Sequence, residues 1–183
     1  MKPVTCVQDV PPAIERRVRA RYADQVHALT ELGFQELCCY SELLGKYSLL
    51  RSLPMVIFMR IRREVLYWRP PLQAAASFVL LRHRDPETVA LPMGMGVKLY
   101  TGFADGTLAV TANFVSMAVP RANSGVRKQS EDMSIPTAWG RHQERVATFT
   151  ANGGAILSAD SFAVYVAMSR QEDSSLRPDP PLR

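Results

Sequence analysis

The chain has 183 residues, of which 47% are hydrophobic and 21% are charged, and this ordinary composition excludes a largely disordered protein. The length suits one domain, and no apolar run approaches the roughly 20 residues that a membrane-spanning helix needs. The net charge of +5 comes from the first half, since residues 11–84 hold 12 basic and 6 acidic residues, whereas residues 85–183 hold 9 and 10.

The excess of positive charge predicts an anionic partner, because a basic surface attracts phosphate backbones, anionic lipid and acidic protein faces alike. The cysteines Cys6, Cys38 and Cys39 do not make the even set that a disulfide framework needs, and they predict reduced thiols in a cytoplasmic protein. No soft ligands stand at metal-site spacing, so we expect no metal ion and no cofactor. Residues 1–10 have no apolar core of a secretory signal and are expected to form a flexible N-terminus.

Residues 11–32 have the pattern of an amphipathic helix. Two prolines stand at its start, where a missing N–H costs nothing, and apolar side chains then recur every three or four residues from Ile14 to Leu29. Gly33 follows as a left-handed cap. Most of the arginines lie off the apolar face, as on a solvated helix surface: Arg16, Arg17, Arg19 and Arg21.

A short strand is expected over residues 34–40 and a loop or single turn over residues 41–48. The next stretch, residues 49–69, which we call the apolar–basic segment, has an apolar centre flanked by arginines and ends in aromatic residues. Ile57, Ile61 and Val65 are four residues apart, as on one helix face, although the β-branched content also fits a strand. We predict a helix over residues 53–68.

Three interpretations of the apolar–basic segment are open. It could be an internal element of the core, because arginine stems cover apolar surface. It could also dock on an anionic membrane surface, where arginines meet head groups and Trp and Tyr favour the interface, or on a protein partner. A nucleic-acid partner is not favoured, because no recognition motif accompanies the arginines. The predicted interaction surface consists of Arg60, Arg62, Arg63, Tyr67, Trp68 and Arg69.

The clearest sheet signal follows this segment. Residues 75–82 have the pattern of a strand that runs to a turn at Arg84-Asp85-Pro86. Residues 97–103 and 108–114 alternate in polarity, and Asp105-Gly106 between them predicts a β-hairpin. Lys98 and Tyr100 share the second face of this hairpin, so we expect one side of the sheet to be wet or to line a groove.

The remainder of the chain is predicted to be helical. After a polar connection over residues 119–132, Ser134 caps a helix that ends at Asn152-Gly153-Gly154. A last helix, capped by Ser158 or Asp160, runs to Ser169. The acidic pairs Glu131-Asp132 and Glu172-Asp173 lie in polar stretches, where we expect them to be solvated. Residues 11–173 are predicted to form one domain, followed by a disordered Pro-rich tail over residues 174–183.

These elements together predict an α+β fold. We expect an antiparallel sheet of three to four strands, with the N-terminal and C-terminal helices packed on one face.

Residues that could carry chemistry are few. Gly94 and Gly96 make a G-x-G, but no third glycine and no helix follow, so these glycines predict a bend before a strand rather than a phosphate site. His142 lies on the apolar stripe of its helix and is the one weak candidate for a catalytic base. The alternative is a buried imidazole with a hydrogen-bond partner.

The sequence therefore predicts a non-catalytic binding or interaction module, which docks on an anionic membrane surface or a protein partner through the apolar–basic segment. The alternative is a small enzyme or ligand-binding protein that uses a groove between the sheet and the helix carrying His142. In that case, His142 should open to a cavity with a second titratable side chain within hydrogen-bond reach.

Overall fold

The computed structural model describes residues 5–43, 65–69, 73–116 and 119–176. Within these ranges the chain forms helices α1 (Pro12–Arg21), α2 (Ala23–Glu31), α4 (Ile135–Ala151) and α5 (Phe162–Ser175). The strands of the same ranges are β1 (Thr5–Val7), β2 (Gln35–Leu43), β3 (Val65–Arg69), β4 (Gln73–Arg84), β5 (Glu87–Met93), β6 (Gly96–Gly102), β7 (Leu108–Ala112) and β8 (Val126–Ser130).

The eight strands of the described residues form one mixed sheet. Seven of them follow the order β1-β2-β4-β5-β6-β7-β8, and β3 pairs with β4 beside this path. All of these pairs are antiparallel except β7 with β8, which run parallel. β3 pairs with the first half of β4 and β5 with its second half. β4, the longest of the described strands, thus joins the two parts of the sheet.

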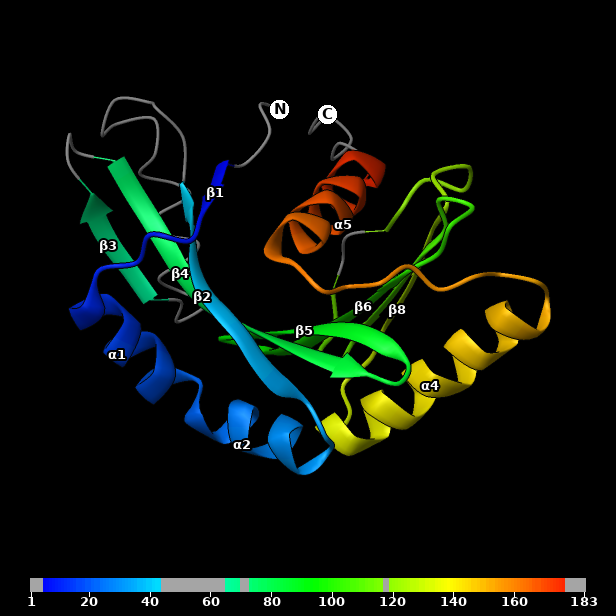
Figure 1. The fold of residues 1–183 in the computed structure, drawn as a ribbon, viewed down its shortest axis with the longest axis horizontal. Helices are drawn as coiled ribbons and strands as arrows, with labels where there is room; N and C mark the ends of the chain where they lie inside the picture. Colours follow the sequence, from blue (N-terminus) through cyan, green and yellow to red (C-terminus); the bar gives the residue numbers. More distant parts are fainter. Residues whose placement is uncertain (1–4, 44–64, 70–72, 117–118, 177–183) are drawn as a thin grey trace, which may run out of the picture.

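Helices cover both faces of this sheet (Figure 1). The sheet bends around α5, which lies in its hollow, and α1, α2 and α4 lie along the outer side. We call these the concave and the convex face. α1 contacts β3 and β4, α2 contacts β5 and α4, and α4 contacts β6 and β7. Both faces of the central strands are therefore buried, as the uninterrupted burial of β7 shows.

The expected antiparallel sheet of three to four strands with helices on one face is thus wrong, although the α+β class holds. Four strands that the sequence did not predict enlarge the sheet, namely β1 in the expected flexible N-terminus, β3 in the expected helix, and β5 and β8. β5 is almost wholly buried and contains Pro92, so it has no alternation to read. β8 is the last strand in the sheet order and pairs with β7, and its largely polar residues belong to the stretch for which the sequence predicts a polar connection.

The described end of the apolar–basic segment is a strand and not a helix. Val65 lies opposite Ser77 and Arg69 opposite Gln73 in the antiparallel pair of β3 with β4. Backbone hydrogen bonds to β4 stabilise these residues as a strand. The four-residue spacing of apolar side chains that predicts a helix carries no information about such a partner strand. Residues 49–64 lie outside the described residues. The loop expected from residue 41 is also wrong over Ser41–Leu43, which continue β2.

The helices follow the sequence more closely. The single helix expected over residues 11–32 is divided into α1 and α2 at Tyr22, whose ring is fully buried while its N–H still donates to the carbonyl of Val18. The Ser134 hydroxyl caps α4 as predicted, accepting from the N–H of Thr137 at 3.2 Å. α5 begins after Ser161 and not after Ser158 or Asp160, and it continues to Ser175.

The predicted turns are confirmed. Gly106 has φ +82°, and Asp105 accepts a hydrogen bond from the N–H of Thr107 at 2.8 Å, which closes the hairpin between β6 and β7. β4 turns into β5 at Arg84-Asp85-Pro86. Gly96 follows the turn between β5 and β6, in the place where we expected a bend before a strand.

Gly96 and Gly106 provide a matched pair for a stability test, because both have positive φ. A Cβ on Gly106 meets nothing within 4 Å, so Gly106→Ala should cost only the backbone strain, about 1 kcal/mol. A Cβ on Gly96 would come within 2.3 Å of Oδ1 of Asn113, which accepts from the N–H of Val97. Gly96→Ala should therefore lower the free energy of unfolding by about 1–3 kcal/mol more. Urea unfolding of the two variants would measure this difference, and equal losses would contradict it.

Candidate functional site

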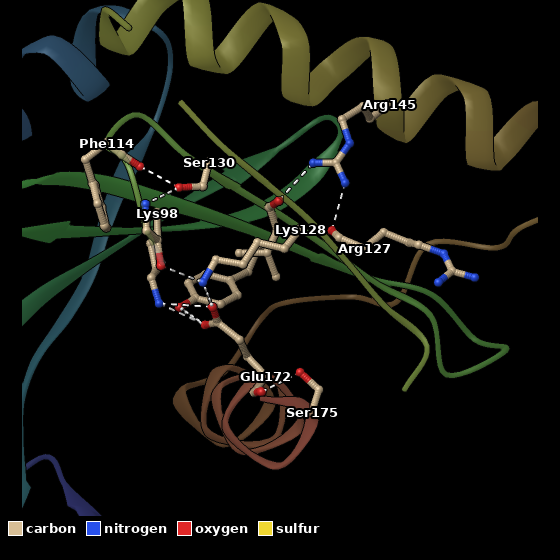
Figure 2. A network of polar contacts seen from close by, with 11 residues as sticks. Lys98, Phe114, Arg127, Lys128, Ser130, Arg145, Glu172 and Ser175 are labelled. Atoms are coloured by element: carbon tan, nitrogen blue, oxygen red, sulfur yellow. Dashed lines mark hydrogen bonds and ion pairs between the residues drawn. The ribbon is translucent and has the colours of Figure 1, made fainter. Parts of the chain in front are cut away.

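A cluster of charged side chains lies between α5 and the concave face of the sheet (Figure 2). The carboxylate of Glu172, whose side chain is 3% exposed, accepts hydrogen bonds from Nζ of Lys98 at 3.0 and 3.1 Å. Nζ of Lys128 lies 3.0 Å from the same carboxylate, and the Tyr100 hydroxyl donates to it at 2.8 Å. One buried carboxylate therefore holds two ammonium groups and a phenol.

The register of the sheet brings these donors together. Lys98 and Tyr100 are two residues apart on β6, so they point to the same face. Val110 of β7 lies opposite Tyr100 and, on its other side, beside Lys128 of β8. All three donors thus belong to the rigid sheet, and only the acceptor comes from α5.

The electrostatics of the cluster keep Glu172 ionised. Desolvation alone would raise the pKa of Glu172, but the charges and hydrogen bonds of Lys98 and Lys128 lower it below its ordinary value. Desolvation, together with the negative charge of Glu172, raises the pKa of Tyr100 well above its ordinary value. The expectation that Glu172 is solvated is therefore wrong. Asp173, the next residue, does remain exposed, and partial desolvation and the charge of Glu172 raise its pKa.

Buried tyrosines continue this polar layer along the concave face. The hydroxyl groups of Tyr40 on β2 and Tyr165 on α5 are 2.6 Å apart, and Tyr40 also donates to Glu42 at 3.3 Å. Desolvation raises the pKa of both tyrosines well above the ordinary value. The hydroxyl groups of Tyr40 and Tyr165 are therefore neutral, and the hydrogen bond between them connects α5 with the sheet.

The Glu172 cluster is built for attachment rather than for proton transfer. A general base needs a pKa near the working pH and a lone pair directed at substrate. The carboxylate of Glu172 has a lowered pKa, and its two oxygens accept from three donors of the sheet. Sequence patterns did not point to this residue, although the Lys98 and Tyr100 alternation did predict a polar side of the sheet.

A second polar cluster lies on the convex face, around His142 of α4. His142 is fully buried, with Nε2 3.0 Å from the Thr101 hydroxyl and Nδ1 2.9 Å from the Thr111 hydroxyl. Thr101 donates to the carbonyl of Glu87, and Thr111 accepts from Arg145, so we infer that Nε2 carries the proton and Nδ1 accepts. Desolvation and the nearby charge of Arg145 lower the pKa of His142 to about 3.

Arg145 completes this second cluster. Its guanidinium also donates to the carbonyls of Val110 at 2.9 Å and Arg127 at 2.7 Å, and so it connects α4 with β7 and β8 (Figure 2). The side chains that hydrogen-bond to His142 are threonines and not titratable groups. This arrangement matches a buried imidazole with hydrogen-bond partners and does not meet the condition set for a catalytic histidine.

The predicted interaction surface is described only in part. Arg60, Arg62 and Arg63 lie outside the described residues, and Trp68 and Arg69 belong to β3. Tyr67 is half-buried, and its hydroxyl is 3.0 Å from that of Ser41, which is in turn 2.7 Å from the hydroxyl of Ser77. Val65 is buried in the core. The C-terminal end of the apolar–basic segment is therefore attached to the sheet.

The cysteines are free, and desolvation raises the pKa of Cys6 to about 12 and that of Cys39 to about 11, so both are protonated thiols at neutral pH. Across the described ranges, no group of three or more His, Cys, Asp or Glu side chains is placed to hold a metal ion. No helix in this part of the chain has the length and apolarity to cross a membrane.

No family model, curated protein or solved structure matches the chain. Function therefore has to be argued from these residues.

Proposed function

We propose that the protein is a non-catalytic binding module that docks on an anionic membrane surface through the apolar–basic segment. The observation that supports this most is that three arginines come directly before a strand that is fixed in the sheet. Val65 is buried and Tyr67 is hydrogen-bonded to Ser41, so the segment ends on a rigid body. Arg60, Arg62 and Arg63 precede Val65 by only two to five residues.

The chemistry of the segment favours a lipid surface as the partner. Arginines bind the phosphate and carboxylate groups of anionic lipid, and each basic residue near such a surface is worth about 1 kcal/mol. The apolar run and Trp68 are of the residue types that favour the interfacial layer of a bilayer. The buried polar clusters, in contrast, are satisfied within the protein, and no observation favours the small enzyme or ligand-binding protein built around His142.

Sedimentation with vesicles tests this proposal. The protein should bind phosphatidylserine-containing vesicles at low salt and should be released as salt rises, because salt screens the attraction. It should not bind neutral phosphatidylcholine vesicles, which lack the anionic groups. Reversing three charges in Arg60→Glu/Arg62→Glu/Arg63→Glu should weaken binding by about 100-fold.

The matched control reverses three exposed arginines elsewhere, in Arg84→Glu/Arg121→Glu/Arg170→Glu. It changes the net charge equally and should weaken binding much less. Equal losses in the two variants would reduce the attraction to net charge alone, and equal retention on neutral and anionic vesicles would remove the electrostatic proposal.

A further inference from the structure

The charges of the Glu172 cluster are divided by sign between the sheet and α5. The positive charges belong to the sheet, as Lys98 on β6 and Lys128 on β8, whose side chains are only 16% and 4% exposed. The carboxylate between them belongs to α5 (Figure 2). The sheet therefore holds two ammonium groups in fixed positions, and a single helix supplies the anion that fills the space between them.

The stability of the α5 interface does not by itself explain these charges. Burying two ammonium groups and a carboxylate costs desolvation energy, and a well-packed apolar contact of similar size is often at least as stable. α5 already has apolar contacts on the same side, since Tyr165 packs edge-on against Tyr100 with ring centroids 5.9 Å apart and Met168 is buried. The two lysines of the sheet therefore point to a role besides attachment of the helix.

The donors of the sheet are arranged as in a site for an oxyanion. Nζ of Lys98 and Nζ of Lys128 lie within 3.1 Å of the Glu172 carboxylate, and the Tyr100 hydroxyl donates to it at 2.8 Å. Lysines hold phosphate and carboxylate groups through charge-assisted hydrogen bonds of this kind. Because all three donors belong to strands of one sheet, they keep this geometry without the helix.

The two ammonium groups balance two negative charges rather than one. Glu172 supplies the first. Asp173 is exposed and supplies a second nearby, since Lys98 and Lys128 oppose the desolvation and the charge of Glu172 that raise its pKa. A phosphate group near neutral pH carries up to two negative charges on a single phosphorus. α5 thus presents to the sheet the charge of a phosphate dianion, divided over two side chains.

We propose that Lys98, Lys128 and Tyr100 form a binding site for a phosphate dianion, free or as a monoester, which α5 occupies with Glu172 until the ligand displaces it. This inference goes beyond the proposed function and does not depend on it. Phosphate fits better than a monocarboxylate, because its charge matches both ammonium groups and its oxygens can accept from all three donors. The described structure is then the closed state, in which α5 is an internal competitor.

The first test uses the parent protein and inorganic phosphate. Hydrogen–deuterium exchange is followed in sodium phosphate and in sodium chloride at equal pH and ionic strength. Phosphate should increase the exchange rate of amides in Phe162–Ser175 by about 10-fold, because the ligand selects the state in which α5 is detached. Amides of α4 are the internal control and should exchange equally in both salts.

The second test measures binding of radiolabelled inorganic phosphate by equilibrium dialysis. Glu172→Gln removes the charge of the internal competitor, which acts at a high effective concentration, so this variant should bind phosphate at least about 10-fold more tightly than the parent. Glu144→Gln, on the exposed side of α4, is the matched control and should bind like the parent. Lys98→Gln/Lys128→Gln/Glu172→Gln leaves no charge of this cluster unpaired and should lose phosphate binding. Circular dichroism checks the fold of each variant.

The outcomes decide between a ligand site and a purely structural ion cluster. Absence of phosphate binding in the parent and in folded Glu172→Gln would overturn the proposal. Retained binding in the neutral triple variant would also overturn it, because the bound phosphate would then lie elsewhere. If phosphate binds while the exchange of α5 does not change, the displacement of α5 is wrong. Tighter binding of glycerol 3-phosphate than of inorganic phosphate would identify a monoester as the ligand, and weaker binding would identify free phosphate.

Discussion

Glu172→Gln should lower the free energy of unfolding by about 3 kcal/mol at pH 7, because it leaves two buried or half-buried ammonium groups without their carboxylate. The substitution keeps the size of the side chain, so the loss reports charge and not packing. Urea unfolding followed by circular dichroism would measure it. Glu144→Gln, which changes an exposed carboxylate on α4, is the control and should stay within about 0.5 kcal/mol of the parent.

The Glu172 cluster should also make the free energy of unfolding depend on pH in the acidic range. The pKa of Glu172 is lower in the folded protein than in the unfolded chain, so its contribution is complete above the unfolded value of about 4.3 and disappears as pH falls through the folded value. The parent should therefore lose more stability than Glu172→Gln as pH is lowered from 5 towards 3. If the two curves stay parallel, Glu172 is not the paired carboxylate described above.

His142 should make the protein markedly less stable in mild acid. Its pKa is about 3 when folded and about 6.5 when unfolded, so between these values the unfolded chain binds more protons. The contribution of His142 to the free energy of unfolding is complete above about pH 7 and should fall by about 2 kcal/mol between pH 7 and pH 5, and by about 4–5 kcal/mol by pH 3. Urea unfolding at a series of pH values would give this slope.

His142→Gln should remove most of this dependence on pH, even though losing a ring that bonds Thr101 and Thr111 lowers stability at pH 7. His27→Gln, at an exposed position on α2, is the control and should keep the slope of the parent. A parent curve that is flat between pH 7 and pH 5 would mean that His142 takes up a proton in the folded protein, and the buried neutral imidazole would then be wrong.

The sequence predicted correctly those features that depend on a few neighbouring residues, namely helix caps and turns. Ser134 caps α4, Gly33 and Gly106 have the positive φ of a cap and a turn, and Asp105-Gly106 reverses the chain between β6 and β7. Each of these features depends on a few neighbouring residues, so the pattern of those residues is enough to predict it.

Longer-range pairing could not be read in the same way. Val65–Arg69 become a strand because β4 lies beside them, and Val126–Ser130 become one because β7 does. The side-chain pattern of these two segments does not predict a partner strand. Val65 continues the four-residue apolar spacing of the apolar–basic segment, and β8 is largely polar. The sheet was therefore predicted too small and with one covered face instead of two.

The sequence by itself determined the α+β class, the positions of the turns and helix caps, and the excess of arginine in the first half. Only the tertiary structure decided that Glu172 is a buried ion partner of Lys98 and Lys128, that His142 is enclosed by threonines, and that α1 adjoins the end of the apolar–basic segment. The reason is physical: caps and turns are satisfied within a few residues, whereas a charge or an imidazole takes its pKa and its role from groups that only the fold brings within hydrogen-bond distance.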